Sequence, residues 1–175
     1  MRYRRTWLPG GTYFFTVVAH ERRPILTDPA VLDALRTAFR RELMAGSFRL
    51  DAIVVLPDHL HCLWTQPQDD PDFAKPWQRI KAAVSRSVAD SLEGSRNASR
   101  RSKGERGVWQ RRYWEHAIRD EDDLRRHADY IHFNPVRHGM VKSPGAWPHS
   151  TFRRFVAHDH YPADWATDPG DLGRE

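Results

Sequence analysis

The order of strand-like and helix-like segments is the feature of this sequence that most restricts its fold. Runs rich in aromatic and β-branched residues are typical of strands, and apolar residues spaced three or four apart are typical of amphipathic helices. These patterns predict strands at 12–19, 48–56, 59–65 and 108–120, and helices at 30–43, 77–92 and 121–134. The first six elements follow the β-α-β-β-α-β order of a ferredoxin-like domain. We therefore predict an α+β fold with an antiparallel sheet, helices on one face, and a further C-terminal helix.

Several residues mark the expected ends of these helices. Asp28 followed by Pro29 is typical of an N-cap and the first helical position. Asp120 is a second N-cap candidate, and the acidic residues after it suit the positive end of a helix dipole. Proline disfavours helical geometry in the residue before it. Because Pro135 follows Asn134, we expect the third helix to end there.

The charge and the single cysteine restrict the setting of the protein. The 175 residues include 28 Lys and Arg against 23 Asp and Glu, a formal charge of +5 that favours an anionic partner such as nucleic acid. Cys62 is the only cysteine, which excludes an internal disulfide and a cysteine-rich zinc site. No apolar run approaches the roughly 18 residues of a membrane span. These features predict a cytoplasmic protein with no membrane partner.

Two segments have compositions that do not favour a packed core. Residues 94–107 contain no apolar side chain larger than alanine and carry five basic residues, Arg96, Arg100, Arg101, Lys103 and Arg106. We expect a mobile loop, which is either a solvated connector or a basic arm over nucleic acid. Residues 157–175 are rich in Asp, Pro and Gly, so we expect a disordered tail. The predicted organisation is therefore one domain over residues 1–156.

His59 and His61 form an unusual pair in the third predicted strand. Alternate residues of a strand share a face, so both imidazoles should project from one side. Leu60, Cys62 and Trp64 should point to the other side and pack under helices. Two neutral imidazoles can begin a metal site, but they do not complete a coordination sphere. A polar strand face is the alternative interpretation.

The third predicted helix adds a second candidate group. Its apolar stripe contains Leu124, Ala128 and Ile131. Tyr130 and Asn134 are four residues apart and share a neighbouring stripe. They are either ordinary polar residues of an amphipathic helix, or they have a chemical role. In the second case Tyr130 is a nucleophile and Asn134 binds metal or positions a phosphate. Helical spacing alone does not choose between these alternatives.

Several motifs in the same order resemble one known family. PDHLHCLW at 57–64 followed by DYIHFNPVRHGMV at 129–141 resembles the REP-associated tyrosine transposases, which belong to the HUH single-tyrosine transposases. Three further stretches resemble the same family: YRRTWLPGGTYFFTVV, VWQRRYWEHAIRDEDDLRRHADY and AWPHSTFRRFV. The resemblance extends from about residue 2 to 156 and leaves out the basic loop and the tail.

The resemblance implies roles for four of these residues. His59 and His61 match the two metal-binding histidines, and Tyr130 matches the catalytic tyrosine. Asn134 falls where related insertion-sequence transposases have a glutamine metal ligand. Asparagine keeps the amide oxygen but is one methylene shorter. The implied cofactor is Mg²⁺ or Mn²⁺.

The resemblance also implies an activity and a partner. The activity is that of a metal-dependent single-strand DNA endonuclease and strand transferase, which acts on hairpin-bearing repetitive extragenic palindrome (REP) DNA through a covalent 5′-phosphotyrosine. The setting is bacterial, at the nucleoid, with monomer and homodimer both open. Candidates for contacts to the DNA backbone are Arg2, Arg4, Arg5, Arg111, Arg112, Arg153 and Arg154. The alternatives are a hairpin-binding protein that does not cut, and a nucleotide phosphohydrolase without a covalent intermediate.

Overall fold

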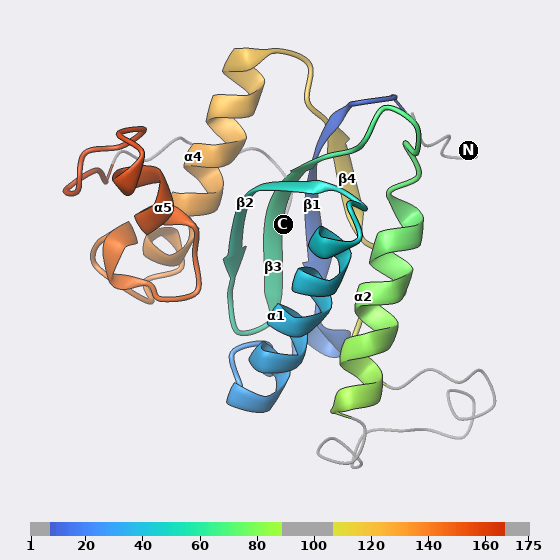
Figure 1. Ribbon diagram of the computed structural model, residues 1–175. Coiled ribbons are helices and arrows are strands. Elements are labelled where there is room, and N and C mark those ends of the chain that lie inside the picture. Colours follow the sequence, from blue (N-terminus) through green and yellow to red (C-terminus); the bar gives the residue numbers. More distant parts are fainter. Residues whose placement is uncertain (1–7, 89–106, 167–175) are drawn as a thin grey trace, which may run out of the picture.

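The computed structural model describes residues 8–88 and 107–166 and has the expected order of elements (Figure 1). The strands are β1 (Thr12–Val18), β2 (Arg49–Val55), β3 (His59–Thr65) and β4 (Trp114–Ala117). The helices are α1 (Pro29–Met44), α2 (Ala74–Ser87), α4 (Glu121–Arg137) and α5 (Phe152–Ala157), with 3₁₀ turns at His20–Arg22 and Pro144–Ala146. None of the helices in the described ranges is long and apolar enough to span a membrane.

The four strands form one antiparallel sheet in the order β2-β3-β1-β4. This arrangement confirms the predicted α+β class and its antiparallel sheet, and it agrees in part with the ferredoxin-like order. β1 and β3 are the central strands, and their register places Thr16 opposite His61 and Val18 opposite His59. β2 and β3 form a hairpin, and β2 ends at Val55, one residue earlier than the predicted strand 48–56. The hairpin therefore places His59 directly after a tight connection.

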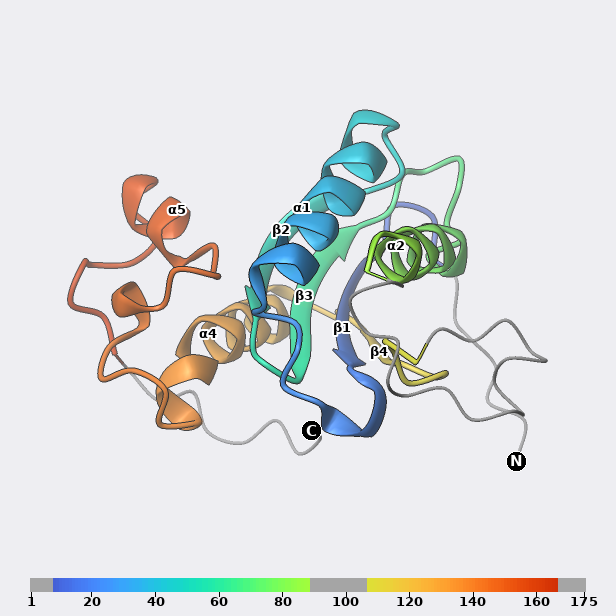
Figure 2. The same cartoon turned by 90° about the horizontal axis from the view of Figure 1, so that it is seen from below.

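The main core lies between one face of the sheet and the pair α1 and α2 (Figure 2). The rings of Phe48 and Trp64 stack at 4.0 Å between centroids, and those of Trp64 and Trp77 at 4.7 Å. Glu42 of α1 accepts hydrogen bonds from the Arg79 guanidinium of α2, with a shortest distance of 2.7 Å. Apolar stacking and this ion pair together hold the two helices on the sheet.

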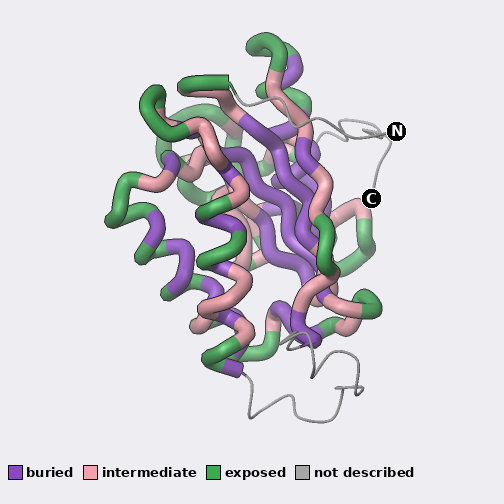
Figure 3. The backbone as a smooth tube through the Cα atoms, turned by 90° about the vertical axis from the view of Figure 1, so that its right-hand side faces the viewer, coloured by how far each residue is buried: buried purple, intermediate pink, exposed green. Residues whose placement is uncertain are grey.

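A second core lies on the opposite face, beneath α4 (Figure 2). It includes Phe14, Leu63, Ala128 and Ile131. The central strands β1 and β3 are buried along most of their length, and the tube in Figure 3 shows this buried centre of the sheet. The prediction of helices on one face thus holds for α1 and α2, while the additional C-terminal helix covers the other face. Side chains on both faces of β3 are consequently enclosed.

The predicted end of α4 is wrong. The helix continues through Pro135 to Arg137. A proline removes only one backbone hydrogen bond, and the helix ends two residues later, so the disruption is confined to the last turn. Asp120 caps the other end as predicted, because its side chain accepts a hydrogen bond from the Asp123 backbone at 2.8 Å. Leu124 was expected in the apolar stripe but is 36% exposed.

Two other predicted boundaries differ from the structure. The strand expected at 108–120 is reduced to β4, with Trp109 forming only an isolated bridge to Ala19. The helix expected at 77–92 begins at Ala74, and its last four positions lie outside the described residues. The basic loop up to residue 106 also lies outside them.

The first part of the expected disordered tail is ordered. The Tyr161 hydroxyl donates a 2.6 Å hydrogen bond to Asp129 of α4, and the rings of Tyr161 and Trp165 stack at 4.5 Å. Aromatic side chains in residues 157–166 therefore outweigh the polar composition of this segment. Residues 167–175 lie outside the described residues.

A short segment runs along the outer edge of β2. The Val55 amide donates to the His149 carbonyl at 2.8 Å, and the Thr151 amide donates to the Ile53 carbonyl at 2.9 Å. Ser150 forms a bridge with Val54 between them. The outer backbone groups of Ile53 and Val55, near the C-terminal end of β2, are therefore paired.

Candidate active site

His59 and His61 lie side by side on the α4 face of β3. Their ring centroids are 4.8 Å apart. Leu60, Cys62 and Trp64 belong to the core on the other face, which confirms the predicted alternation. The two histidines are only 1% and 0% exposed. The pair is therefore a buried polar feature of the strand face that α4 covers.

Each imidazole is held through its Nδ1 atom. His59 Nδ1 lies 2.6 Å from Asp58 Oδ1, and His61 Nδ1 lies 2.9 Å from Thr16 Oγ1. Within the described residues, the buried Nε2 atom of His61 has no hydrogen-bond partner. A partner on one ring nitrogen sets the tautomer and leaves the other nitrogen to bind metal. Both rings are thus prepared to offer Nε2.

The electrostatic surroundings keep His61 in the form that binds a cation. Burial lowers the pKa of His61 well below its usual value, and positive charge on the neighbouring His59 and His138 acts in the same direction. Burial alone raises the pKa of Asp58, but hydrogen bonds and charge from His59 and Arg22 outweigh it and leave that pKa lowered. A neutral His61 imidazole near an ionised Asp58 carboxylate fits a divalent cation.

Tyr130 and Asn134 lie on the side of α4 that faces the sheet. The Tyr130 ring approaches the His61 ring edge-on, with 5.2 Å between centroids. Tyr130 is 2% exposed and Asn134 is fully buried. The structure therefore brings the tyrosine to the histidine pair, with Asn134 one helical turn further along. Two neutral imidazoles and an amide oxygen are a donor set that a divalent metal can use.

Three neighbours of this group were not predicted from the sequence. Phe14 of β1 stacks on His61 at 5.4 Å and meets Tyr130 edge-on at 6.0 Å. The Arg137 guanidinium lies 5.4 Å from the centre of the Tyr130 ring. The His138 ring lies 5.3 Å from that of His59. Arg137 follows Tyr130 by seven residues, a spacing that returns to the same side of a helix and was the available signal.

Four of the predicted DNA-binding arginines lie within the described residues. Arg2, Arg4 and Arg5 are outside the described residues, and Arg111 and Arg112 are exposed just before β4. Arg153 donates to the Gly145 carbonyl, and Arg154 donates to the backbone carbonyls of Leu50 and Asp51. The Arg153 guanidinium thus contacts the 3₁₀ turn at Pro144–Ala146, and the Arg154 guanidinium contacts the backbone of β2.

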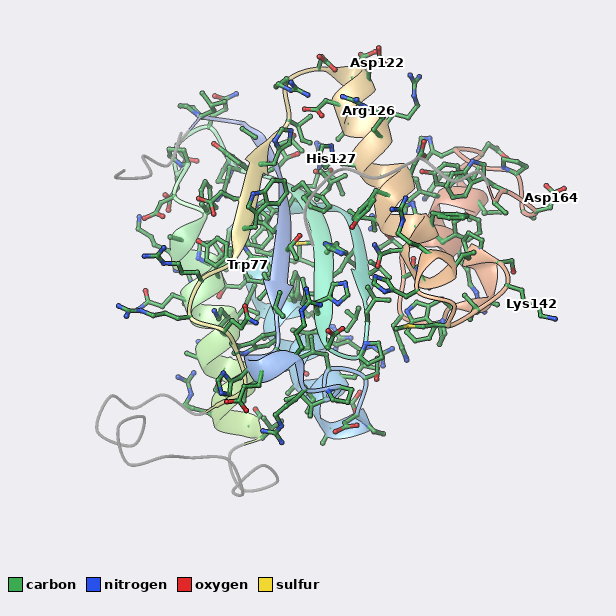
Figure 4. All side chains as sticks on the ribbon, turned by 180° about the vertical axis from the view of Figure 1, so that it is seen from behind. Trp77, Asp122, Arg126, His127, Lys142 and Asp164 are labelled. Atoms are coloured by element: carbon green, nitrogen blue, oxygen red, sulfur yellow. The ribbon has the colours of Figure 1, made fainter. Side chains whose placement is uncertain are left out.

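A second cluster of possible ligands joins β4 to α4. His116, Asp123 and His127 each offer an atom within 4.8 Å of the others. Figure 4 shows His127 on the side of α4 toward the sheet, and its ring lies 4.8 Å from that of Phe14. Asp123 also accepts hydrogen bonds from the backbone and Nε of Arg119, at 3.1 and 3.0 Å. A positive guanidinium on the shared carboxylate opposes a cation, so this cluster is the weaker candidate.

Comparisons with known proteins establish the family. The chain matches the family described as "Transposase IS200 like" over residues 9–134, a range that includes His59, His61, Tyr130 and Asn134. A REP-associated tyrosine transposase of Escherichia coli K12 is 43% identical over 170 residues, which cover 97% of this chain and 93% of that protein. The chain belongs to the REP-associated tyrosine transposases. This confirms the resemblance seen in the sequence.

Two further comparisons agree with this assignment to the REP-associated tyrosine transposases. A relative from Haemophilus influenzae is 40% identical over 168 residues, which cover 95% of this chain and 94% of that one. A solved structure of a REP-associated tyrosine transposase bound to a REP hairpin superimposes with a TM-score of 0.81 and 41% identity. That match covers 99% of this chain and 95% of the other.

Proposed function

We propose that this transposase is a metal-dependent single-strand DNA endonuclease and strand transferase with Tyr130 as its nucleophile. The observation that carries the proposal is the edge-on approach of Tyr130 to His61, 5.2 Å between ring centroids, beside the anchored His59. A phenol beside two buried imidazoles, each anchored through Nδ1, suits the cleavage of a phosphodiester. Membership of the family supports the same chemistry.

His59 and His61 would hold Mg²⁺ or Mn²⁺ through Nε2, with the Asn134 side-chain oxygen as a third ligand. When bound, the cation supplies positive charge that neutralises and orients the scissile phosphate. Asp58 and Thr16 keep the two rings fixed through Nδ1. The remaining steps depend on side chains of the protein itself.

Tyr130 would attack phosphorus through its phenolic oxygen. A bond forms between that oxygen and the 5′-phosphate, and the bond from phosphorus to the 3′-oxygen of the preceding nucleotide breaks. The phenol gives up a proton and the released 3′-oxygen takes one. Because the phosphotyrosine keeps the energy of a phosphodiester, attack by a 3′-hydroxyl can reverse the step and join DNA. The charge of Arg137 over the ring, at 5.4 Å, favours the phenolate.

The proposed substrate is single-stranded DNA that carries a REP hairpin. The solved relative that superimposes on this chain is bound to such a hairpin. The formal charge of +5 also suits a polyanion. We place the protein at the nucleoid of the bacterial cytoplasm, because REP DNA is part of the chromosome.

The experiment follows the 3′ end of a hairpin-bearing DNA strand. The strand is labelled at its 3′ end and incubated with Mn²⁺, and the products are separated on a denaturing gel. The parent protein should retain the 3′-labelled fragment as a covalent adduct. Tyr130→Phe should bind the strand equally but form no adduct, because only the nucleophilic oxygen is lost. His59→Ala, His61→Ala and added EDTA should each abolish the adduct. Cleavage with free ends and no adduct would identify a phosphohydrolase instead.

The second candidate is a hairpin-binding protein that does not cut. The burial of Tyr130, at 2% exposed, favours it, since a DNA strand reaches the hydroxyl only after α4 or a neighbouring segment shifts. Hairpin binding by the parent with no cleavage in Mn²⁺ or Mg²⁺ would establish this candidate.

A further inference from the structure

The turn after β1 contains two adjacent residues in a left-handed backbone conformation. Glu21 has φ 55° and Arg22 has φ 50°. Side chains other than those of Asn and Asp rarely adopt this region, because Cβ then crowds the backbone. Such strain persists only where the surrounding structure holds it, and it is common at functional sites. Contacts with the surrounding structure must therefore hold this turn in its strained conformation.

The turn is attached to the connection between β2 and β3. The Ala19 amide donates to the Asp58 carbonyl at 2.7 Å, and the Leu26 amide donates to the Pro57 carbonyl at 2.7 Å. The Arg22 guanidinium donates to Asp58 Oδ2 at 3.0 Å. Asp58 is thus held by its backbone and its side chain, directly before His59.

The other carboxylate oxygen of Asp58 faces His59. Oδ1 lies 2.6 Å from Nδ1 of that imidazole, so one carboxylate joins Arg22 to His59. His61 has a different support, the neutral hydroxyl of Thr16 at 2.9 Å. A carboxylate on a metal-binding histidine orients the ring and increases the basicity of its free nitrogen. The strained turn is therefore connected, through Asp58, to His59 and not to His61.

We propose that Arg22 and Asp58 are positioning residues of the metal centre. The left-handed backbone at Arg22 places its guanidinium on Asp58 Oδ2. Asp58 is thereby fixed so that Oδ1 accepts the Nδ1 proton of His59 and leaves Nε2 for the cation. This inference rests on the metal site of the proposed function. It adds Arg22 to that site, explains how Asp58 is held in place, and gives a reason for the strain in the turn.

Two matched variants separate the positioning role from the strain. Arg22→Gly and Glu21→Gly each replace a left-handed residue with one that adopts this conformation freely. Only Arg22→Gly removes the contact to Asp58, since the Glu21 side chain pairs with His20 at 3.0 Å. Both variants should unfold at or above the temperature of the parent. A loss of metal affinity in Arg22→Gly alone would then be independent of folding.

The first readout is Mn²⁺ binding to the DNA-free protein by isothermal titration calorimetry. Glu21→Gly should bind with the affinity of the parent, and Arg22→Gly about 3- to 10-fold more weakly. Asp58→Ala should bind about 10- to 100-fold more weakly, the usual effect of removing a partner of a metal-binding histidine. Asp58→Asn should be intermediate, because the amide oxygen still accepts the Nδ1 proton without a negative charge.

The second readout is the tautomer of His59 in the metal-free protein, from the nitrogen shifts of its ring in ¹H–¹⁵N spectra. The parent should carry the proton on Nδ1, and Asp58→Ala should give a mixture of tautomers. Equal Mn²⁺ affinity in both glycine variants, or an unchanged tautomer in Asp58→Ala, would overturn the inference, as would a parent that binds no Mn²⁺. A parent that binds Mn²⁺ but cuts no DNA would refute the proposed function and leave the inference standing.

Discussion

The guanidinium of Arg137 lies 5.4 Å from the centre of the Tyr130 ring, across the last two turns of α4. A cation over an aromatic face is attracted by the ring and stabilises negative charge on its substituent. The helix thus carries both the proposed nucleophile and a charge that favours its reactive form.

We expect Arg137→Met to slow single-turnover cleavage of hairpin DNA by about 10- to 100-fold, as with other side chains that stabilise developing charge. Arg137→Lys should retain more activity, because it keeps the positive charge. Arg125→Met is the control, since Arg125 is exposed on the same helix and pairs with Asp122. Equal cleavage rates for Arg137→Met and Arg125→Met would show that Arg137 does not assist the cleavage step.

Asn134 allows a test of the third metal ligand by thermal unfolding with and without Mn²⁺. A cation that binds only the folded state raises the unfolding temperature. The rise should be smaller for Asn134→Ala than for the parent. For Asn134→Asp it should be larger, because a buried carboxylate is costly until a cation neutralises it. Equal rises in all three proteins would show that the residue is no ligand.

The ion pair between α1 and α2 predicts a dependence of stability on pH. Burial raises the pKa of Glu42, but hydrogen bonds from Arg79 and Ser47 outweigh it and leave the pKa lowered. The ionised form is thus favoured in the folded state. Its contribution is present above the ordinary carboxyl pKa of about 4.3 and is lost as the pH falls through the lowered value.

Glu42→Gln should therefore cost about 1–3 kcal/mol of unfolding free energy at pH 7, the range for hydrogen bonds to charged groups. The difference from the parent should shrink as the pH falls below about 4. Urea denaturation at several pH values measures both effects. Asp33→Asn is a control on the same helix, because its pair with Arg36 is exposed on both sides. It should change stability little at any of these pH values.

Tyr161→Phe tests the packing of residues 157–166 against α4. The Tyr161 hydroxyl donates to Asp129 at 2.6 Å, and burial raises the pKa of Asp129. Without this donor a partly buried carboxylate loses its partner, at a cost of about 1–3 kcal/mol. The variant should also be cut faster by protease near residue 161. Asp164→Asn, at an exposed position of the same segment, should behave as the parent in both assays (Figure 4).

The placement of His59 and His61 was predictable because it depends on a local property. Alternation along a strand puts them on one face whatever the strand pairs with. The residues that contact His61 were not predictable in the same way. Thr16 and Phe14 come from β1, more than forty residues away, and meet His61 only through the strand register. A long-range register of this kind has no signature in a single sequence.

The errors have local causes that can be identified. Pro135 in the sequence favours a helix end at Asn134, but a proline within the last turn costs only one hydrogen bond. The helix continues to Arg137, whose guanidinium lies over the Tyr130 ring. The Asp, Pro and Gly content of residues 157–175 favours a disordered tail. Tyr161 and Trp165 stack on each other and on neighbouring rings, which composition does not reveal.

The pairing of residues 149–151 with β2 has a consequence for colloidal behaviour. β2 is an edge strand of seven residues, and an unpaired edge of that length invites strand addition from a second molecule. The bridge between Val54 and Ser150, with the hydrogen bonds on either side of it, occupies the outer groups of Ile53 and Val55 at one end of this edge. The opposite edge is β4, with only four residues. Residues 149–151 thus limit aggregation by covering part of the β2 edge. Chains shortened before residue 149 should self-associate through β2.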